Sequence, residues 1–342
     1  MKRLYWISIL FIAILLGACS TAEEPAAEPA APAAEEPAAE EPVAEEPMAE
    51  EPAAVGEQLY VFLPKSLDNP YWDECRLGME AKAEELGVQA EFLGPPTASA
   101  TEQVAIFEAV IARNPAGIAV SPNDPATVEA AIAMATEAGI PVFAWDADAP
   151  NSVRLAYVGT LNEAAGATAG EELAKAIDYQ GQVAILHGSL SAQNAIERVT
   201  GFEQALAAYP DIEIVAVEPT EDSPDQALSK AEALLQAYPD LAAFYGVTGV
   251  GVPGAAGAIK QANRCGEVAV VGFDVVPQGI EAMRDGCATA LISQRPYGMT
   301  AQTLQMMYDM HNDGWEPDQE FYDTGVEVVY PETLEDFLNT HH

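Results

Sequence analysis

Short apolar runs alternate with amphipathic helical patterns through most of this chain, and that alternation is the strongest constraint on its fold. We expect strands at 59–63, 90–93, 117–120, 141–145, 155–158, 183–186, 212–217, 242–245, 268–273 and 289–292, and extended segments within 322–329. We expect helices at 71–86, 101–113, 125–137, 163–177, 195–209, 224–238, 253–262, 277–284 and 299–312. Continuous apolar strands between amphipathic helices are typical of parallel sheets covered on both faces, so the predicted fold class is α/β.

The strand–helix units are too many for one compact sheet. A break near 159–162 would divide them into two similar lobes. A closed barrel of alternating strands and helices is the structural alternative, but it has eight strands, fewer than the roughly eleven expected here. Both architectures bind ligands beyond the carboxyl ends of their strands, so the residues that directly follow each strand are the candidates for function.

The first residues of the chain have the organisation of an export signal. Lys2 and Arg3 precede an almost uncharged apolar run, 4–16, which is shorter than the about 20 residues of a membrane-spanning helix. Small residues then lead to Cys19, an ending that resembles a bacterial lipobox, in which the cysteine is acylated and becomes the new N-terminus. We expect 1–19 to be a lipoprotein signal peptide and the protein to be exported, periplasmic or at the cell surface, and lipid-anchored to a membrane. An uncleaved membrane anchor is the alternative.

Residues 20–57 consist almost entirely of alanine, glutamate and proline, with prolines recurring at Pro37, Pro42, Pro47 and Pro52. Such regular prolines interrupt a helix, and the segment has no apolar face to bury. We expect a disordered spacer that reaches at most on the order of 100 Å at about 3.1 Å per residue. A functional tether and an unselected low-complexity segment predict the same physical behaviour.

The formal net charge is −40. A surface this negative repels nucleic acid and anionic lipid, so we expect no nucleic-acid partner. It also argues against an anionic substrate unless positive charge is supplied locally. Solubility outside the cell is the simplest account of the acidity.

Three cysteines remain after Cys19. The sequence has no CxxC motif and no Cys/His cluster, so we expect no metal site. Cys265 and Cys287 each precede an apolar run, and they would lie at one sheet edge if those runs are neighbouring parallel strands. A disulfide between them is then one outcome in an oxidising compartment, and three free thiols are the other. Cys75 would be the unpaired thiol.

The residues after the predicted strands have the side-chain types that are typical of sugar-binding sites. Aromatic rings stack on the apolar faces of a sugar ring, while amide and carboxylate groups bond its hydroxyls. The candidates are Asn69, Tyr71, Trp72, Asp146, Asp148, Asn162, Arg198, Asp274, Gln294, and one of Gln193 and Asn194. Each also has a structural interpretation: the aspartates as turn or helix caps, Trp72 as a core aromatic and Arg198 as a solvated helix residue.

The sequence resembles the ribose-type periplasmic binding proteins, also called type I or LacI-like solute-binding proteins, over roughly 58–329. The resemblance rests on Asn69-Pro70-Tyr71-Trp72, Trp145-Asp146, Glu197-Arg198, Gly201-Phe202 and Val270-Val271-Gly272-Phe273-Asp274. It implies two Rossmann-like lobes with parallel sheets, joined by a three-segment hinge that closes on a sugar. It further implies an N-terminal lobe of 58–161 plus 295–323, a C-terminal lobe of 162–294 plus 324–330, and a C-terminal tail of 331–342.

The departures from the ribose-type pattern affect the identity of the ligand. Lys65 and Gln193 are similar to the autoinducer-2 and rhamnose-type branch, but the acidic residue that precedes the glutamine there is Ala192 here. Asp222 stands where ribose binders have an aromatic residue, and the turn around Thr248 is glycine-rich. The resemblance thus adds Lys65, Asp222 and Thr248 to the candidate site. A deoxyhexose, a pentose, a polyol and a furanosyl signal molecule all stay open as ligands.

The function that these features predict is capture of a monosaccharide or related polyol and its delivery to an ABC permease in the membrane, by a monomer without a cofactor. A sensor that presents bound ligand to a chemoreceptor or kinase is the alternative. A tethered glycosidase is a remote one, because no GxSxG, HExxH or phosphate-binding glycine loop is present. A LacI-type DNA regulator shares the fold but does not fit the export signal and the acidity.

Overall fold

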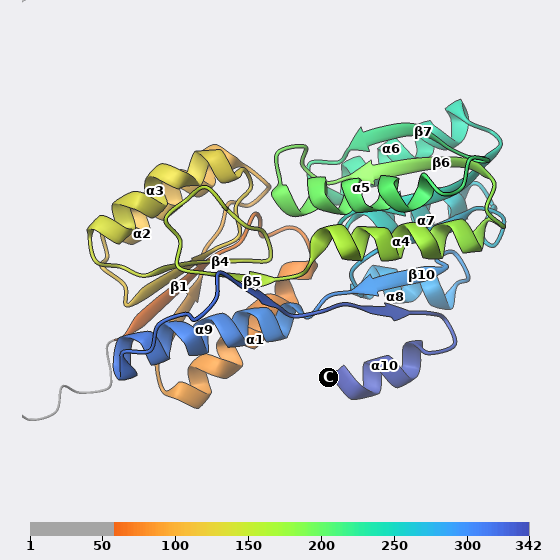
Figure 1. Cartoon of the computed structure of the whole chain (residues 1–342). Helices are drawn as coiled ribbons and strands as arrows, with labels where there is room; N and C mark the ends of the chain where they lie inside the picture. The colour runs from red at the N-terminus through yellow and green to blue at the C-terminus, as the bar shows by residue number, and fades with distance from the viewer. Residues whose placement is uncertain (1–57, 342) are drawn as a thin grey trace, which may run out of the picture. The chain divides into compact units, whose positions relative to one another are not determined.

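The structure is a computed structural model that describes residues 58–341 (Figure 1). Its first half contains β1 (Leu59–Leu63), α1 (Tyr71–Leu86), β2 (Gln89–Phe92), α2 (Ala100–Ile111), β3 (Gly117–Val120), α3 (Pro125–Glu137), β4 (Val142–Trp145), β5 (Tyr157–Gly159), α4 (Asn162–Ala176), β6 (Gly181–His187) and α5 (Gln193–Leu206). Its second half contains β7 (Ile212–Pro219), α6 (Pro224–Ala237), β8 (Leu241–Gly246), α7 (Gly251–Gln261), β9 (Ala269–Phe273), α8 (Pro277–Arg284), β10 (Ala290–Ser293), α9 (Pro296–Asp313), β11 (Phe321–Asp323), β12 (Glu327–Val329) and α10 (Leu334–His341). The predicted signal peptide, Cys19 and the spacer lie outside the described residues.

The strands within 58–341 form two six-stranded sheets. The first has the order β11-β5-β4-β3-β1-β2 with every pair parallel. The second has the order β12-β10-β9-β8-β6-β7 and is parallel except for β12, which runs antiparallel to β10. We call the first sheet with α1, α2, α3 and α9 the first lobe, and the second sheet with α4 to α8 and α10 the second lobe. Two separate sheets confirm the two-lobed α/β prediction, and the closed-barrel alternative is wrong.

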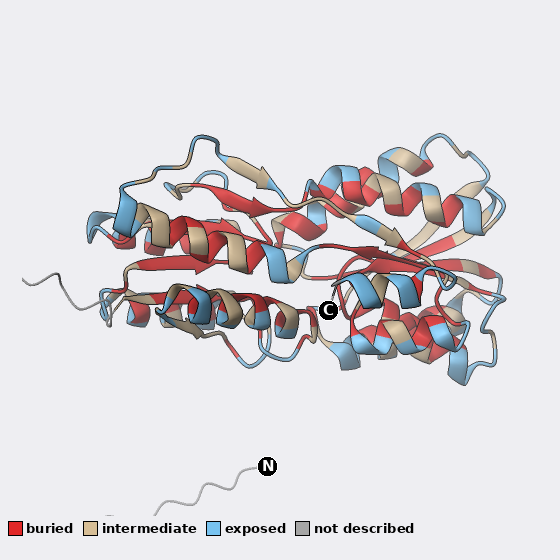
Figure 2. Cartoon of the chain, turned by 90° about the horizontal axis from the view of Figure 1, so that it is seen from below, coloured by how far each residue is buried: buried red, intermediate tan, exposed pale blue. Residues whose placement is uncertain are grey.

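Each sheet is covered by helices on both faces, as its continuous apolar strands require. In the first lobe α1 and α9 pack on one face and α2 and α3 on the other. In the second lobe α4 and α5 cover one face, while α6, α7, α8 and α10 cover the other. Figure 2 shows the consequence: the central strands are drawn as buried, the edge strands are mostly intermediate, and the exposed residues lie on the outward faces of the helices and in loops. Because the helices cover the faces of the sheets and not the edges where the strands end, polar groups can be placed at those edges.

Local sequence signals explain where the helices begin and end. Pro70 precedes the first residue of α1, and Gly87 ends this helix with a left-handed φ of 69°. The Asp124 side chain accepts a hydrogen bond from the backbone N–H of Ala126, and Pro125 takes the first helical position of α3. Both helices have the bounds that the sequence predicts.

The C-terminal end contains an extended segment, as expected from the sequence, and a helix within 331–342, where only a tail was predicted. The segment 322–329 divides into β11 in the first sheet and β12 in the second, so one extended stretch joins the two lobes. Residues Leu334–His341 form α10, and Leu334, Phe337 and Leu338 pack against the core of the second lobe. Together with the connections from β5 to α4 and from β10 to α9, the chain crosses between the lobes three times within the described residues.

The structure contains a disulfide between Cys265 and Cys287, whose Cα atoms are 4.5 Å apart. The two cysteines precede β9 and β10, which are neighbouring parallel strands. Cys75 is a buried free thiol, and burial raises its pKa well above the ordinary value. Of the helices within 58–341, none is both long and apolar enough to cross a membrane.

Candidate ligand-binding site

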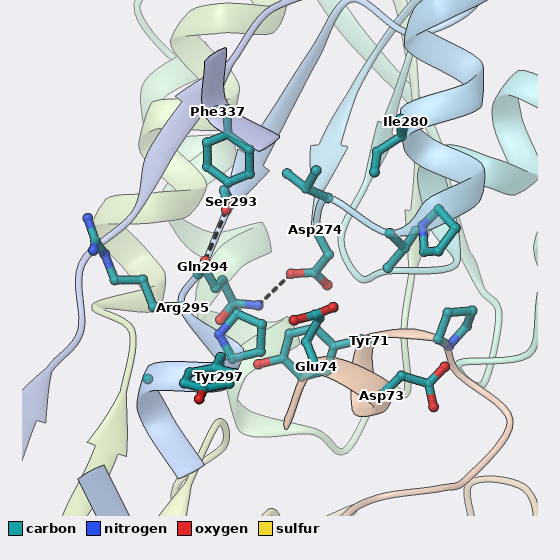
Figure 3. A pocket seen from close by; sticks show the side chains of 16 residues that line it. Tyr71, Asp73, Glu74, Asp274, Ile280, Ser293, Gln294, Arg295, Tyr297 and Phe337 are labelled. Atoms are coloured by element: carbon teal, nitrogen blue, oxygen red, sulfur yellow. Dashed lines mark hydrogen bonds between the residues drawn. The ribbon is translucent and has the colours of Figure 1, made fainter. Parts of the chain in front are cut away.

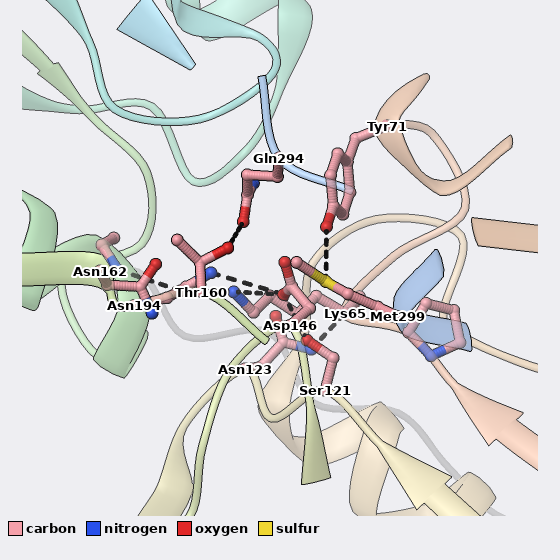
Figure 4. A network of polar contacts seen from close by, with 12 residues as sticks. Lys65, Tyr71, Ser121, Asn123, Asp146, Thr160, Asn162, Asn194, Gln294 and Met299 are labelled. Atoms are coloured by element: carbon pink, nitrogen blue, oxygen red, sulfur yellow. Dashed lines mark hydrogen bonds and ion pairs between the residues drawn. The ribbon is translucent and has the colours of Figure 1, made fainter. Parts of the chain in front are cut away.

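Polar side chains gather where the strands of the two lobes end. Asp146 directly follows β4, Asp274 directly follows β9, and Gln294 directly follows β10. All three are at least nine-tenths buried, as are the neighbouring charged residues Lys65 and Arg198. Figure 4 shows part of this network: Lys65 and Asp146 of the first lobe lie beside Asn194 of the second, and Gln294 lies beside Thr160. Buried charges need partners, so the contacts of each group determine what it can still bind.

The first-lobe part of the network is centred on Asp146. The hydroxyl of Ser121 donates to Asp146 Oδ2 over 2.6 Å, and Lys65 Nζ lies 3.4 Å from the same oxygen. The side chains of Lys65 and Asp146 are only 4% and 3% exposed. A buried carboxylate without a counter-charge is costly, and Lys65 supplies the positive charge beside Asp146.

Asn194 connects this part of the network to the second lobe. Lys65 Nζ donates to Asn194 Oδ1 over 2.7 Å, and Asn194 Nδ2 donates to Asp146 Oδ2 over 3.4 Å. Gln193 instead donates to Glu197 on the next turn of α5 and is half-buried. Of the two neighbouring amides, Asn194 is the one that faces the network.

The second-lobe part is organised by Arg198, which is 1% exposed. Its guanidinium donates to Asn162 Oδ1 over 2.9 Å, to the carbonyl oxygen of Val247 over 3.1 Å and to Gln294 Oε1 over 2.7 Å. It also lies 3.9 Å from the centre of the Phe273 ring. These contacts fix the guanidinium plane, so its orientation is set before any ligand arrives.

Gln294 carries the network on to Asp274 and back to the first lobe. Its Nε2 donates to Asp274 Oδ1 over 2.8 Å, and its Oε1 accepts from the Thr160 hydroxyl over 2.9 Å. Burial raises the pKa of Asp274 to about 6, although Arg198 and the Gln294 hydrogen bond both act to lower it. Asp274 is thus a carboxylate whose desolvation is only partly compensated by the protein.

The aromatic residues at the start of α1 lie beside this network. Tyr71 is 5% exposed and directs its hydroxyl to Met299 Sδ, 3.7 Å away. Trp72 is 3% exposed and packs edge-on against Tyr71 and Trp145, with ring centroids 4.9 Å and 5.4 Å apart. The side chain of Asn69 accepts from the Tyr71 backbone N–H and so fixes the start of the helix.

Asp148, a candidate from the sequence, lies apart from the network. Its carboxylate pairs with the guanidinium of Arg154, with Nη2 2.7 Å from Oδ2, and it caps the backbone N–H of Ala149. Asp222 and Thr248 are buried, but each has a side-chain oxygen without a hydrogen-bond partner.

Three network residues were missed in the sequence analysis although they obey the same rule. Ser121 directly follows β3, Thr160 directly follows β5, and Asn123 lies two residues beyond Ser121. Asn123 donates to the backbone carbonyl of Lys65, and its own carbonyl accepts from Ser191 Oγ of the second lobe. Their small or common polar side chains have no distinctive pattern in the sequence. Their positions directly after strands are the signal that could have identified them.

The buried side-chain atoms without hydrogen-bond partners have a common location. Within the described residues they are Ser66 Oγ, Trp72 Nε1, Trp145 Nε1, His187 Nδ1, Asp222 Oδ1 and Thr248 Oγ1. Five belong to residues at the end of a strand or in the loop that follows it, and Trp72 is the second residue of α1, the helix that follows β1. Buried polar groups are otherwise almost always paired, so this concentration indicates where a polar ligand is accommodated.

A cavity of about 370 Å³ opens beside the network. Its wall is formed by the start of α1, the segments after β9 and β10, and α10, and it shares Tyr71, Asp274 and Gln294 with the network (Figure 3). Most of its other lining residues are apolar, among them Val276, Ile280 and Phe337. Asp73, Glu74, Ser293 and Arg295 also line it, so the cavity adjoins the polar site and combines an apolar wall with a few polar groups.

The described residues contain no group of three or more His, Cys, Asp or Glu side chains that could hold a metal ion. What the two lobes enclose is instead a set of preorganised hydrogen-bonding groups beside aromatic rings. Together, two α/β lobes joined by three crossings and a buried polar site at their strand ends define a two-lobed solute-binding protein.

The comparisons with known proteins agree with this class. The sequence model of the family described as periplasmic binding protein domain matches residues 60–314. The chain belongs to the periplasmic binding protein family. Members of this family are binding proteins, so the chain is a binding protein and not an enzyme.

Two curated relatives cover most of the chain. The D-allose-binding periplasmic protein of Escherichia coli (strain K12) is 29% identical over 264 residues, covering 75% of this chain and 85% of the relative. The ribose import binding protein of Haemophilus influenzae is 30% identical over 231 residues, covering 68% of this chain and 78% of the relative.

Solved structures share the fold over nearly their whole length. An ABC transporter solute-binding protein from Burkholderia graminis in complex with D-arabinose has a TM-score of 0.78 and 34% identity, covering 82% of this chain and 97% of that chain. The glucose-galactose binding protein GanP from Geobacillus stearothermophilus has a TM-score of 0.76 and 34% identity, covering 81% of this chain and 98% of that chain. Both are type I architectures with two α/β lobes, as here.

Proposed function

We propose that this chain is a sugar-binding protein that holds a neutral monosaccharide or related polyol between its two lobes. The observation that carries the proposal is that the buried, unpartnered side-chain polar atoms of the described residues lie at the strand ends of both lobes, in the loops just beyond them, or, for Trp72, at the start of α1. Each such atom is costly unless a ligand or water bonds it, and a molecule with several hydroxyl groups can satisfy many at once.

The chemistry of the surrounding groups favours a neutral ligand over an anionic one. Asp146 and Asp274 are buried acceptors, and Arg198 and Lys65 already have carboxylate or amide partners. An anionic ligand would therefore lie beside buried carboxylates, and neither Lys65 nor Arg198 would be free of other partners to neutralise its charge. Hydroxyls can donate to the carboxylates and accept from Arg198, while Tyr71 and Trp72 provide the apolar surface that a sugar ring requires. The relatives named for allose, ribose and arabinose binding support the same ligand class.

The proposed role is delivery of the sugar to an ABC permease. The sugar binds the open form, and closure of the two lobes about the three crossings completes the hydrogen bonds and excludes water. The closed monomer then docks on the permease. The lipobox-like ending at Cys19 and the proline-interrupted spacer, 20–57, would hold this protein near the membrane that contains the permease. The ribose import proteins among the relatives support a transport role.

The experiment that tests the proposal is thermal melting of the purified full chain against neutral monosaccharides and six-carbon polyols, with gluconate as the anionic control. A ligand present at 100 times its Kd should add about 2.7 kcal/mol to the unfolding free energy, which raises Tm by roughly 5 to 10 °C at this size. At least one neutral sugar should raise Tm while gluconate does not. A response to gluconate alone, or no response to any neutral sugar or polyol at 10 mM (on the order of 10,000 times a micromolar Kd), would contradict the proposal.

A further inference from the structure

Three unpartnered polar atoms lie together in the second lobe, at the ends of β6, β7 and β8. His187 is the last residue of β6, Asp222 follows β7, and Thr248 follows β8. These side chains belong to residues that are 5%, 5% and 7% exposed. His187 Nδ1, Asp222 Oδ1 and Thr248 Oγ1 have no hydrogen-bond partner. We call these residues the β6–β8 cluster; His187 was not among the candidates from the sequence.

The geometry around Gly188 shows that the side chains of Asp222 and Thr248 both lie against this residue. A Cβ atom at Gly188 would lie 2.8 Å from Thr248 Cγ2 and 2.9 Å from Asp222 Oδ1, so only glycine leaves room between them. The backbone of His187 is fixed beside them, because its carbonyl accepts from both the N–H and the hydroxyl of Thr220, each over 2.8 Å. Asp222 itself has a left-handed φ of 53°, which holds its carboxylate in this place.

Three side-chain atoms of the β6–β8 cluster have no hydrogen-bond partner in the protein, whereas side chains in the rest of the site bond to one another. Arg198, Asn162 and Gln294 bond to one another, and Gln294 also bonds Asp274. That group lies toward β9 and β10, whereas the cluster lies at the three strands on the other side of β9 in the sheet order. A ligand that reaches only the Arg198 side leaves three polar atoms buried without partners.

The chemistry of the cluster suits one hydroxyl group. Asp222 accepts a hydrogen bond, and Thr248 both donates and accepts. Burial lowers the pKa of His187, so its imidazole is neutral at pH 7 and can pair with a neutral group. A hydroxyl placed among them can donate to the carboxylate while it accepts from the threonine or the imidazole.

We propose that the β6–β8 cluster is a subsite for a hydroxyl on a carbon outside the sugar ring, which makes the preferred ligand a six-carbon sugar rather than a pentose. The inference rests on the proposed function and deepens it. The ring hydroxyls form hydrogen bonds with Asp146, Arg198 and Asp274. The exocyclic hydroxymethyl group extends from the ring toward the ends of strands β6 to β8. His187 becomes a specificity-determining residue of the site.

The test uses pairs of pyranose sugars that differ only by the hydroxymethyl group: D-allose with D-ribose, D-galactose with L-arabinose, and D-glucose with D-xylose. Affinities of the full chain for each pair are measured by isothermal titration calorimetry. For the pair whose ring hydroxyls fit the site, we expect the hexose to bind about tenfold or more tightly than the pentose, because at least one hydrogen bond to a charged group is gained.

The variants Thr248→Val and Asp222→Asn remove one member of the cluster each while keeping its size, and Asn tolerates the left-handed backbone at 222. Each should weaken hexose binding by about tenfold and pentose binding by clearly less. Thr200→Val, at an exposed position of α5, is the matched control and should change neither affinity. Thermal melting of each variant without sugar verifies that it folds.

The other outcomes are distinct. Equal losses for hexose and pentose would assign the cluster to a ring hydroxyl and overturn the inference while leaving the proposed function intact. A wild-type pentose that binds as tightly as its hexose, or variants without effect, would overturn it in the same way. If no member of any pair binds and no other neutral sugar does, the proposed function itself fails, and the inference fails with it.

Discussion

Three buried carboxylates of the site share an unusual backbone conformation. The φ angles of Asp146, Asp222 and Asp274 are 60°, 53° and 76°. A left-handed conformation costs free energy for a residue with a Cβ, although aspartate tolerates it better than most. Each of these residues follows the end of a strand, where the turn directs the side chain across the sheet edge. Strain held at such positions is typical of residues that are kept for binding rather than for stability.

Asp274 makes folding stability depend on pH. Its pKa is about 6 in the folded chain against an ordinary value of 3.8. Between these values the folded chain keeps a proton that the unfolded chain has released, so this contribution to stability is complete below pH 4 and is lost as the pH rises through 6. The loss is on the order of 3 kcal/mol, at 1.36 kcal/mol per pKa unit.

Asp274→Asn removes this titration. Chemical unfolding from pH 4 to pH 7, without sugar, should show that the variant gains stability relative to the wild type as the pH rises, by roughly 2 to 3 kcal/mol over the range. A difference between the two proteins that stays constant over this range would show that Asp274 does not titrate as described.

Lys65 and Asp146 form a buried pair that is expected to act as a unit. Lys65→Met leaves Asp146 as an uncompensated buried charge and should destabilise the fold by about 3 to 5 kcal/mol. Lys65→Met combined with Asp146→Asn should cost clearly less than the sum of the two single changes. The exposed pair Lys260–Asp285 is the control, since such pairs are worth about 0 to 1 kcal/mol. Additive effects of the buried pair in a double-mutant cycle would argue against its coupling.

At the scale of elements, the periodicity of the sequence predicted most helices and strands because the signals were local. Pro70 and Gly87 mark both ends of α1, and Asp124-Pro125 marks the start of α3. The helix α10 was missed because Leu334, Phe337 and Leu338 form too short a pattern to be distinguished from a polar tail. Its stability comes from packing on the second lobe, which is a tertiary contact that local sequence does not contain.

The candidate site was predictable in its location but less so in its contacts. The strand-end rule and the family resemblance pointed to Asp146, to Arg198 and to one of Gln193 and Asn194. In the structure Asn194 contacts Asp146, and Asn162 and the Tyr157 hydroxyl link Arg198 to Asp146. The same rule could not separate Asp148, which pairs with Arg154, because both aspartates follow β4 within a few residues. It also passed over His187, since a histidine at a strand end has no distinctive neighbours in the sequence. Which side chains face each other depends on turn geometry, and that is set by the packed fold.

The disulfide between Cys265 and Cys287 should stabilise the second lobe. It closes a loop over a sequence separation of 22 residues, which corresponds to about 3 kcal/mol in the chain-entropy description. The double variant Cys265→Ser, Cys287→Ser should therefore melt roughly 5 to 10 °C below the oxidised wild type. Wild type with a reducing agent is the matched control and should approach the variant. Equal melting temperatures for the oxidised and reduced wild type would contradict a stabilising role.

At the scale of the whole molecule, Gly249 provides a test of lobe closure. It lies in the turn after β8, and a Cβ atom there would be 3.1 Å from Asn69 Oδ1 and 3.3 Å from Tyr71 Cβ in the first lobe, and 3.1 Å from Asp274 Oδ2 in its own lobe. A side chain at this position would act as a wedge between the lobes. Closure requires close packing at this point, so a wedge should weaken the bound state more than the fold.

Gly249→Val should weaken sugar binding by at least tenfold while Tm without sugar changes by less than about 3 °C, since the wedge acts mainly between the lobes and not within their cores. Gly257→Ala is the control, because its added Cβ would meet only Leu228 within the second lobe. Its effect on sugar binding should be small. Unchanged sugar affinity in Gly249→Val would show that the lobes do not need to approach at this point.

The central claim is that a neutral sugar binds between the lobes on the network of Asp146, Arg198 and Asp274. The most direct measurement is a crystal structure of the full chain with the sugar that gives the largest rise in Tm. We predict a sugar ring beside Tyr71 and Trp72, with its hydroxyls on the two carboxylates and the guanidinium. A sugar found instead in the apolar cavity beside Val276 and Phe337, or on the outer surface of either lobe, would contradict the claim.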